Sequence, residues 1–442
     1  MGMMLSLAEA LPALKDTATT FARIENPEGV FPPCEIVPLG PIYPRLDAPP
    51  TAILLDMDGT ITQTEPLFLH GVEEVVRRVT GWESPAAWAG LDPARDYPKI
   101  VGFSTLRNLE YLYGACADAI QPERFFREAL RGLVYLHAHD APRETVHWLD
   151  TLTTAYGLEA WRAFADRPGD APRQQQLINE AVGRFAHIGR DLFARLGLII
   201  FHAGYIETLE KVNRGEGAEV SRAIYGDPSV PAIAPMAGIP LLCALVKGWL
   251  PADAASGLAE AIPFAEADTD TPDSRAATLK SLCRHFETAP IPVGLVTSSG
   301  THEVALVLRA VFRAMTDEAR SWPLPAPARD RILEGFAHPD RLFETMVTCD
   351  DVAGGRTKPF RDPYSLALNR LGLDDIRARY VIGFEDTEAG IIAQRGAGIG
   401  VPCAVPIPHT LHHDFTAAAH RLPGGIPQAI FQHSLFFQPQ TT

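Results

Sequence analysis

The sequence predicts an α/β fold, in which an open parallel sheet is interrupted by a large inserted helical domain. Three apolar segments, TAILLD from Thr51, PIPVGLVTSSG from Pro290 and ARYVIGFEDTEAG from Ala378, each end in polar side chains. Short continuous apolar runs are typical of parallel strands that are buried on both faces. Because a long segment of helical character separates the first run from the second, we expect an insertion after the first strand.

Composition and charge indicate a soluble globular protein. Of the 442 residues, 46% are hydrophobic and 21% are charged, which excludes a disordered chain. The 39 Lys and Arg against 54 Asp and Glu give a formal net charge of −15, which repels nucleic acid and anionic membranes. No run of about 18 uncharged apolar residues, the length of a membrane span, occurs, and the six cysteines form no CxxC pair. We expect a cytoplasmic protein with reduced thiols and with no nucleic-acid or membrane partner.

Local patterns predict the elements in chain order. The start is proline-rich and suits an extension that wraps or links, because proline removes backbone donors. Apolar residues recur at helical spacing from Pro66 to Val79, at the start of the insertion. We expect helices over 301–345, a last strand over 398–405 and a last helix over 413–422. The predicted parts are an N-terminal extension (1–50), a core with the catalytic groups (51–62 and 290–442) and an inserted α-helical cap domain (63–289).

Two carboxylates follow the first predicted strand. Asp56 and Asp58 are two residues apart, and Gly59 lets the chain turn at once, so both can be presented in a concave loop. One carboxylate can attack as a nucleophile while the other moves protons. Taken alone, the Asp-Gly pair fits an ordinary loop or a helix cap equally well.

Hydroxyls and a cation follow at later positions. Thr297, Ser298, Ser299 and Gly300 follow the second strand, where hydroxyls and turn amides can hold phosphate oxygens, although such a cluster alone is more often a helix cap. Lys358 lies in the segment RTKPFRDPY, stiffened by two prolines, and can supply a fixed cation. Without this context the lysine would be interpreted as a solvated surface residue.

Two further acids end the third predicted strand. Glu385 and Asp386 are hard oxygen ligands of the kind that magnesium prefers. A magnesium ion beside Asp56 would also offset the crowding of four carboxylates. The sequence therefore predicts a Mg²⁺ site here. His137 and His139, with His147 nearby, suggest a second metal site only weakly, because the chain has 14 histidines.

The ordered set DMDGT, TSSG, TKP and GFEDTEAG resembles the motifs of the haloacid dehalogenase superfamily, in its phosphatase and phosphomutase branch. The resemblance covers 51–62 and 290–405, and ITQTEPLFLH and KPFRDPY are similar to the β-phosphoglucomutase-like subgroup. It implies a Rossmann-like core, a helical cap inserted after the first motif, and magnesium-dependent transfer of a phosphoryl group to an aspartate. Gln63 departs from the pattern, because the subgroup commonly has an acid there.

The resemblance also implies roles for individual residues. Asp56 would be the nucleophile and Asp58 the general acid and base, with the Asp58 carbonyl on magnesium. Lys358 would balance charge between Asp56 and the phosphoryl group. The other implied site residues are Thr297, Ser298 and Gly59 at the phosphoryl group, and Glu385 and Asp386, together with Asp56, on the metal.

The function predicted from these features is hydrolysis of a phosphomonoester of a small metabolite through a phospho-aspartyl intermediate. Asp58 favours phosphate esters, because dehalogenases of the superfamily lack this second carboxylate and phosphonate hydrolases usually carry alanine there. A sugar phosphomutase is the alternative enzyme. A binding or regulatory protein that keeps the core only for ligand recognition is the alternative from another class.

Overall fold

The structure is a computed structural model that describes residues 7–26, 30–138, 149, 151–185, 187–262 and 271–439. The chain divides into two compact units. The first, here called the sheet unit, comprises Met1–Gln63, Ala234–Gly300 and Leu308–Thr442. The second, here called the helical unit, comprises Thr64–Ile233 and Thr301–Val307. The six cysteines, all among the described residues, form no disulfide with one another.

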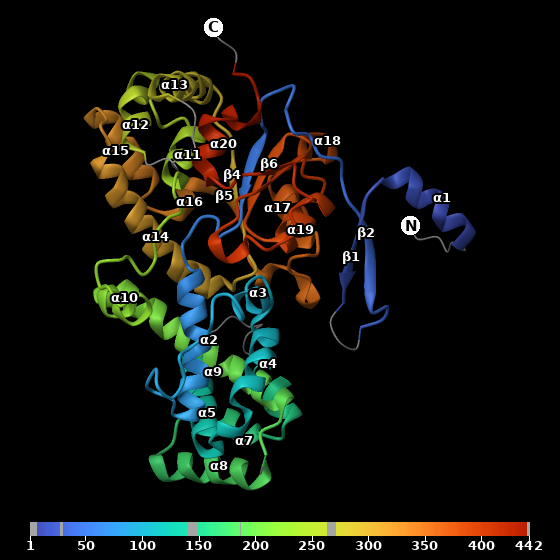
Figure 1. The fold of residues 1–442 in the computed structure, drawn as a ribbon, viewed down its shortest axis with the longest axis vertical. Coiled ribbons are helices and arrows are strands. Elements are labelled where there is room, and N and C mark those ends of the chain that lie inside the picture. The colour runs from blue at the N-terminus through green and yellow to red at the C-terminus, as the bar shows by residue number, and fades with distance from the viewer. Residues whose placement is uncertain are drawn as a thin grey trace. The chain divides into compact units, whose positions relative to one another are not determined.

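The sheet unit contains a six-stranded sheet in which every pair of neighbouring strands is parallel (Figure 1). The predicted α/β fold with a Rossmann-like parallel core is therefore confirmed. From one edge to the other the strands are β5 (Phe343–Val347), β4 (Val293–Val296), β3 (Ala52–Leu55), β6 (Val381–Glu385), β7 (Val401–Ala404) and β8 (His420–Arg421).

The three predicted strands lie side by side at the centre of this sheet. Every residue of β3, β4 and β6 is buried, as their continuous apolar runs predict. Leu55 at the end of β3 is paired with Leu295 on one side and Phe384 on the other. The polar residues that follow the three strands are therefore brought to one edge, at the switch point where α/β sheets form ligand sites.

Helices of the sheet unit cover the strands. α17 packs on β4 and β5, and α19 packs on β6 and β7. The helices are α11 (Ile239–Val246), α12 (Ala255–Ala261), α13 (Pro272–Thr288), α14 (Thr301–Ser321, whose first seven residues belong to the helical unit), α15 (Ala326–Gly335), α16 (Pro339–Leu342), α17 (Asp362–Arg370), α18 (Asp375–Ala378), α19 (Glu388–Gly396) and α20 (Gly425–Phe431).

The N-terminal extension contains α1 (Leu7–Thr17) and an antiparallel hairpin of β1 (Phe21–Glu25) and β2 (Cys34–Pro38). Ala22 and Ile24, on one face of β1, are buried with Leu39 and Phe360. The extension therefore packs on the sheet unit through alternate residues of a strand.

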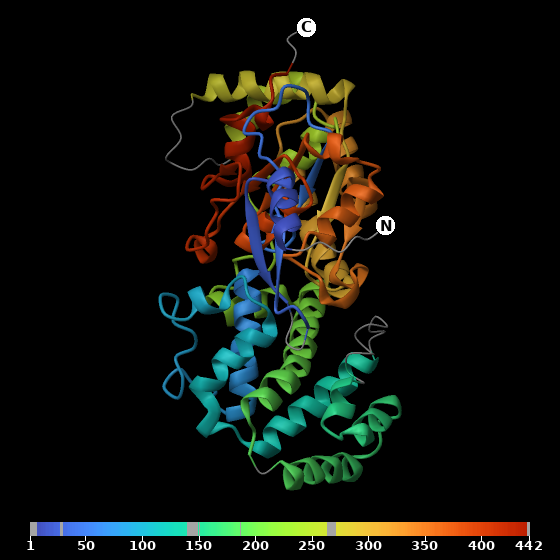
Figure 2. The ribbon, with the colours of Figure 1, turned by 90° about the vertical axis from the view of Figure 1, so that its right-hand side faces the viewer.

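The helical unit is built around one long apolar helix, α9 (Arg190–Lys211), which packs against α2, α4 and α5. Figure 2 shows α9 as the long green helix of this unit. The other elements are α2 (Glu65–Thr80), α3 (Tyr97–Ile100), α4 (Thr105–Cys116), α5 (Pro122–Ala138), α7 (Glu159–Asp166), α8 (Ala171–Arg184) and α10 (Gly217–Tyr225), with a π-helical turn at Val212–Glu216.

Apolar residues lie all around α9, which is the pattern of a helix at the centre of a core. In the part of the chain that the structure describes, the stretch Arg190–Tyr225 is long and apolar enough to cross a membrane. Within the apolar window of this stretch, 67% is buried in the protein, so a core role accounts for its composition. This is consistent with a soluble protein.

The end of the inserted unit differs from the boundary expected at 289. The helical unit ends at Ile233, and residues 234–300 belong to the sheet unit. The reason is packing: every residue of α11 is buried, and α11 contacts α13 and α20. The Ile291 amide also donates to the Val246 carbonyl at 3.0 Å, which ties α11 to the start of β4.

Two other expectations about the core are wrong. The stretch 301–345 is helical only as far as Leu342, because Phe343–Val347 form the edge strand β5. The helix expected over 413–422 is absent from this described segment. The Asp414 carboxylate accepts from the Thr416 amide at 2.9 Å in a turn, and His420 then pairs with Cys403 in β8. A local side-chain hydrogen bond and an open sheet edge therefore override a helix-like composition.

Candidate active site

Asp56 is presented by the turn that follows β3. The amide of Gly59 donates to the Thr62 carbonyl at 2.9 Å, and Gly59 has a φ of +77°, which glycine adopts without strain. A Cβ atom on Gly59 would lie 2.5 Å from Asp386 Oδ2. The glycine therefore serves two purposes: it turns the chain, and it leaves room for the carboxylate of Asp386.

Lys358 reaches this turn from the loop before α17. Its ammonium group contacts the carboxylate of Asp56, lies 2.5 Å from Glu385 Oε1 and donates to the Val296 carbonyl at 2.8 Å. The lysine side chain is only 7% exposed. One cation thus joins the ends of β3, β4 and β6.

Glu385 is held by a chain of buried hydrogen bonds. The Tyr364 hydroxyl donates to Glu385 Oε1 at 2.7 Å, and Gln394 Nε2 donates to the Tyr364 oxygen at 3.2 Å. The Thr387 hydroxyl donates to Glu385 Oε2 at 3.2 Å. A Cβ atom on Gly390, in the first turn of α19, would overlap the Glu385 carboxylate. Side chains from α17 and α19 therefore fix where this acid points.

Three acids form a cluster with the donor chemistry of a magnesium site. Oxygen atoms of Asp56, Glu385 and Asp386, all buried, lie within 4.8 Å of one another. Lys358 pairs with Asp56 and Glu385, and the carboxylate of Asp58 is close enough to act electrostatically on Asp56, so acids outnumber the cation here. Hard oxygen ligands and uncompensated negative charge fit a divalent cation such as Mg²⁺. The residues present therefore fit the metal that the sequence predicts.

The buried setting of this cluster shifts the pKa values of Asp56 and Lys358. Burial and the neighbouring carboxylate of Glu385 hold the pKa of Asp56 well above its usual range, although Lys358 opposes them. For Lys358, burial works against the ammonium form, but Asp56 and Glu385 outweigh it and raise the pKa of the lysine. Lys358 is therefore a permanent cation at neutral pH.

The second carboxylate of the turn is held by the loop after β4. The Ser299 hydroxyl donates to Asp58 Oδ2 at 3.2 Å, and the Ser299 amide donates to Thr297 Oγ1 at 3.0 Å. Thr297 is buried and Ser298, the next residue, is exposed. The structure thus links Asp58 to the TSSG segment through Ser299, whose hydroxyl was expected to hold a phosphate oxygen together with its neighbours and instead donates to Asp58.

Three functional contacts could not be read from the sequence. Tyr364 lies in the quoted segment RTKPFRDPY, but nothing in that segment indicates that its hydroxyl reaches Glu385. Ser299 lies inside the TSSG motif, but nothing there indicates that its hydroxyl reaches Asp58, and Gln394 gave no signal beyond proximity to a motif. Each of these contacts joins segments that meet only when the sheet forms, so spacing along the chain does not reveal them.

The weaker candidates gain no support. His137 pairs with Asp166 at 2.7 Å, whereas His139 and His147 lie outside the described residues.

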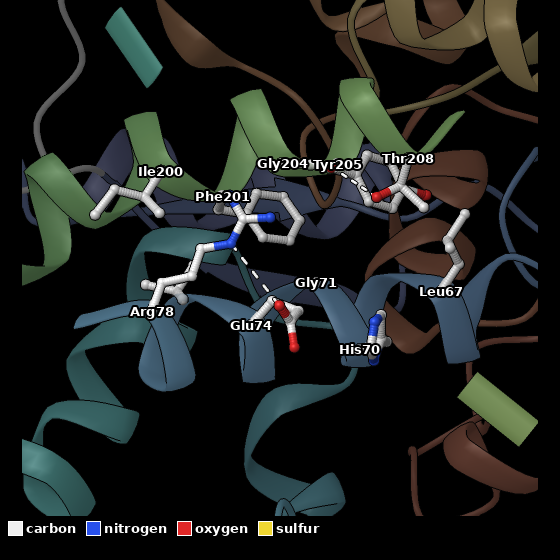
Figure 3. A pocket seen from close by; sticks show the side chains of 11 residues that line it. Leu67, His70, Gly71, Glu74, Arg78, Ile200, Phe201, Gly204, Tyr205 and Thr208 are labelled. Atoms are coloured by element: carbon white, nitrogen blue, oxygen red, sulfur yellow. Dashed lines mark hydrogen bonds and ion pairs between the residues drawn. The ribbon is translucent and has the colours of Figure 1, made fainter. Parts of the chain in front are cut away.

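A small pocket lies between α2 and α9 of the helical unit (Figure 3). Its polar lining includes His70, Glu74 and Arg78, and Arg78 pairs with Glu74 at 3.8 Å. Burial lowers the pKa of His70, which favours a neutral ring in the pocket wall.

Comparisons with known proteins give structural likenesses only. No protein-family model matches the chain, and no curated protein matches it by sequence. CbbY from Rhodobacter sphaeroides in complex with phosphate has a TM-score of 0.39 at 15% identity, covering 86% of this chain and 96% of that chain. A variant of CbbY in complex with xylulose-1,5-bisphosphate has a TM-score of 0.39 at 16% identity, covering 85% and 95%.

A third structure carries the name of the superfamily. It is a haloacid dehalogenase (HAD) hydrolase of family IA, variant 3, from Entamoeba histolytica, with a TM-score of 0.35 at 13% identity, covering 80% of this chain and 83% of that chain. This third structure is named for the superfamily that the motifs of the chain resemble. Because these TM-scores are below 0.5, we base the function on the residues of this chain.

Proposed function

We propose that this protein is a magnesium-dependent phosphomonoester hydrolase of the haloacid dehalogenase type, acting on a small phosphorylated metabolite through a phospho-aspartyl intermediate at Asp56. One observation carries the proposal. The ammonium group of Lys358 contacts Asp56 and Glu385, while Asp56, Glu385 and Asp386 offer oxygen atoms within 4.8 Å of one another. A carboxylate that can attack, a fixed cation and a set of oxygen atoms that can bind a metal therefore lie close together in one buried site, which supports the proposal.

In the first step, a carboxylate oxygen of Asp56 attacks phosphorus and the bond from phosphorus to the ester oxygen breaks. Asp58 donates a proton to that leaving oxygen. In the second step, Asp58 accepts a proton from water as the water oxygen attacks phosphorus, the bond to Asp56 breaks, and inorganic phosphate is released. The hydrogen bond from Ser299 keeps Asp58 oriented for both transfers.

The remaining site residues bind the phosphoryl group or the metal. Lys358 holds one side of the transferring phosphoryl group next to Asp56, and the hydroxyls of Thr297 and Ser298 hold its other oxygens. Asp56, Glu385, Asp386 and the Asp58 carbonyl would hold magnesium. When bound, the ion stabilises the negative charge that develops on the phosphoryl oxygens.

The helical unit supplies specificity in this proposal. It is inserted directly after the turn that carries Asp56, and it acts as the cap that excludes water and selects the leaving group. In this proposal the cap domain is the segment Thr64–Ile233 of the helical unit.

The test is release of inorganic phosphate from para-nitrophenyl phosphate with Mg²⁺. We expect activity in the wild type, loss with chelator and loss in Asp56→Asn. The matched control is Asp340→Asn, which neutralises an exposed acid of α16 and should keep full activity. Equal rates in the wild type and Asp56→Asn would show that Asp56 is not the nucleophile and would favour the binding-protein alternative.

A second experiment examines the intermediate. Asp58→Asn should slow the attack of water, so that a phosphoryl group accumulates on the peptide containing Asp56 and is detected by mass spectrometry. A screen of phosphorylated metabolites then identifies the substrate. Formation of bisphosphorylated sugar without free phosphate would identify a mutase.

A further inference from the structure

The N-terminal hairpin packs directly on the loop that carries Lys358. Phe360, two residues after the lysine, is buried in a cluster with Ala22 and Ile24 of β1 and with Leu39. Ile392 of α19 packs against the same cluster, and Figure 1 shows β1 and β2 on the side of the sheet unit where α19 lies. The hairpin therefore forms one wall against which this loop rests.

A charged clamp, formed by Glu35 and Arg356, joins the hairpin to the loop that carries Lys358. Arg356, two residues before the lysine, donates from Nη1 to Glu35 Oε1 at 2.7 Å and from Nη2 to Glu35 Oε2 at 3.2 Å. Its Nε donates to Asp362 Oδ1 at 2.9 Å, and its guanidinium lies 4.2 Å from the centre of the Phe360 ring. A bidentate pair fixes direction as well as distance. One side chain, Arg356, thus ties β2 to the start of α17. Lys358 lies in the loop between Arg356 and Asp362.

The backbone before the clamp provides little restraint of its own. Gly354 and Gly355 both have positive φ values, of +66° and +68°, and a Cβ atom on either would meet nothing within 4 Å. Glycine has the greatest conformational freedom of any residue. The contacts of Arg356 and Phe360 therefore add to those of Lys358 itself in holding the loop after these glycines.

We propose that Glu35 is a positioning residue for Lys358: through its bidentate pair with Arg356, the N-terminal hairpin holds the lysine loop where the ammonium group meets Asp56 and Glu385. This inference rests on the proposed function and assigns a task to the N-terminal extension. A small displacement of a charged group at a reacting centre costs much more in rate than in stability.

The clamp is well placed to affect rate rather than folding. The side chains of Glu35 and Arg356 are 33% and 37% exposed, and partly exposed ion pairs contribute little to stability. Lys358 itself contacts the proposed nucleophile Asp56. Glu35 contacts Arg356, two residues before the lysine, and so acts on Lys358 only through the loop backbone. Loss of the clamp should therefore lower kcat while KM and the melting temperature change little.

The experiment compares Glu35→Gln with Glu25→Gln. Glu25 lies on the same hairpin but is paired only with Arg23, at 3.8 Å, among the contacts of the described residues. We expect Glu35→Gln to lower kcat for para-nitrophenyl phosphate by about 10- to 100-fold, with KM changed by less than about twofold. Glu25→Gln should match the wild type. A kcat unchanged in Glu35→Gln would overturn the inference.

Hydrogen exchange separates this inference from the proposed function. In Glu35→Gln, amides of residues 354–361 should exchange faster, while those of the central strands stay as in the wild type. Unchanged exchange in that loop overturns the clamp whatever the activity. Faster exchange in a protein whose wild type releases no phosphate supports the clamp and contradicts the hydrolase.

A double variant tests whether Glu35 acts through Arg356. If it does, Glu35→Gln combined with Arg356→Gln should have the same kcat as Arg356→Gln alone, because the partner is already lost. A further drop in kcat equal to that of Glu35→Gln alone would show that Glu35 acts by another route and would overturn the assignment.

Discussion

The ammonium group of Lys358 donates a hydrogen bond to the carboxylate of Asp56, a residue 302 positions earlier in the chain. The two side chains are 7% and 10% exposed, so their charges meet away from water. Burial of an ammonium is costly unless it is paired, and here Asp56 and Glu385 raise the pKa of Lys358 in spite of its burial. The pair therefore places a permanent cation beside the proposed nucleophile.

Replacing this cation should abolish most of the activity. We expect Lys358→Met to lower kcat/KM for para-nitrophenyl phosphate by about 10²–10³-fold, because the phosphoryl charge loses a fixed partner. Lys247→Met is the matched control, since Lys247 is also mostly buried and pairs with Glu344 in the sheet unit. Initial rates and circular dichroism are the measurements. Equal losses in both variants would point to general damage to the fold.

The acid cluster predicts how Mg²⁺ binding changes when one of its carboxylates is neutralised. Asp386→Asn should weaken Mg²⁺ binding by at least about tenfold, because an anionic oxygen of the cluster becomes neutral. Titration calorimetry with Mg²⁺ measures this directly and needs no substrate. Asp374→Asn, at the residue that caps α18, is the control and should bind as the wild type. Equal affinities in all three proteins would exclude Asp386 as a ligand.

Gly59 has two features that a substitution would disturb: a left-handed backbone and the space occupied by the Asp386 carboxylate. Comparison with a second glycine separates their effects. Gly59→Ala places a Cβ atom 2.5 Å from Asp386 Oδ2 and also strains a φ of +77°. Gly372→Ala carries similar strain, at a φ of +67°, but its Cβ atom would meet nothing within 4 Å. We expect both to lose about 1 kcal/mol of stability from strain, and only Gly59→Ala to lose Mg²⁺ binding and activity.

Chemical denaturation and metal titration of the two glycine variants give the answer. The prediction fails if Gly59→Ala retains the wild-type affinity for Mg²⁺, or if Gly372→Ala loses it as well.

Asp96 in the helical unit predicts a pH dependence of stability. Its carboxylate accepts from Arg95 Nε and Nη2, both at 2.8 Å, and from the Tyr111 hydroxyl at 2.7 Å. The hydrogen bonds from Arg95, followed by that from Tyr111, hold the pKa of Asp96 below its usual value, in spite of the burial of its carboxylate. The folded state therefore favours the ionised form. This stabilisation is present above the unfolded pKa near 4 and is lost as pH falls through the folded pKa.

Asp96→Asn should thus lower the free energy of unfolding by about 1–2 kcal/mol at pH 7, and the difference from the wild type should shrink below about pH 4. Arg95 is 66% exposed, so solvent screening reduces its share of this value. Urea unfolding at several pH values measures the effect, with Asp118→Asn, at an exposed acid, as the control. A difference that is the same at pH 3 and pH 7 would rule out linkage to Asp96 ionisation.

The sequence predicts the centre of the site because its signals there are local. Asp56, Glu385 and Asp386 each follow or end a continuous apolar run, and such runs form adjacent parallel strands whose polar ends meet. Lys358 was found from its segment, RTKPFRDPY. For these residues, the order of the elements along the chain is enough to place them at one edge of a sheet.

Contacts between distant segments required the tertiary structure. The pairing of Glu35 with Arg356 joins residues 321 positions apart, and the hydrogen bond from Tyr364 to Glu385 joins α17 to β6, which α18 separates along the chain. The strand at Phe343–Val347 and the assignment of 234–300 to the sheet unit were missed for the same reason. Periodicity records which face of a segment is apolar, but not which partner covers it. That choice is made by competition among all buried surfaces when the chain folds.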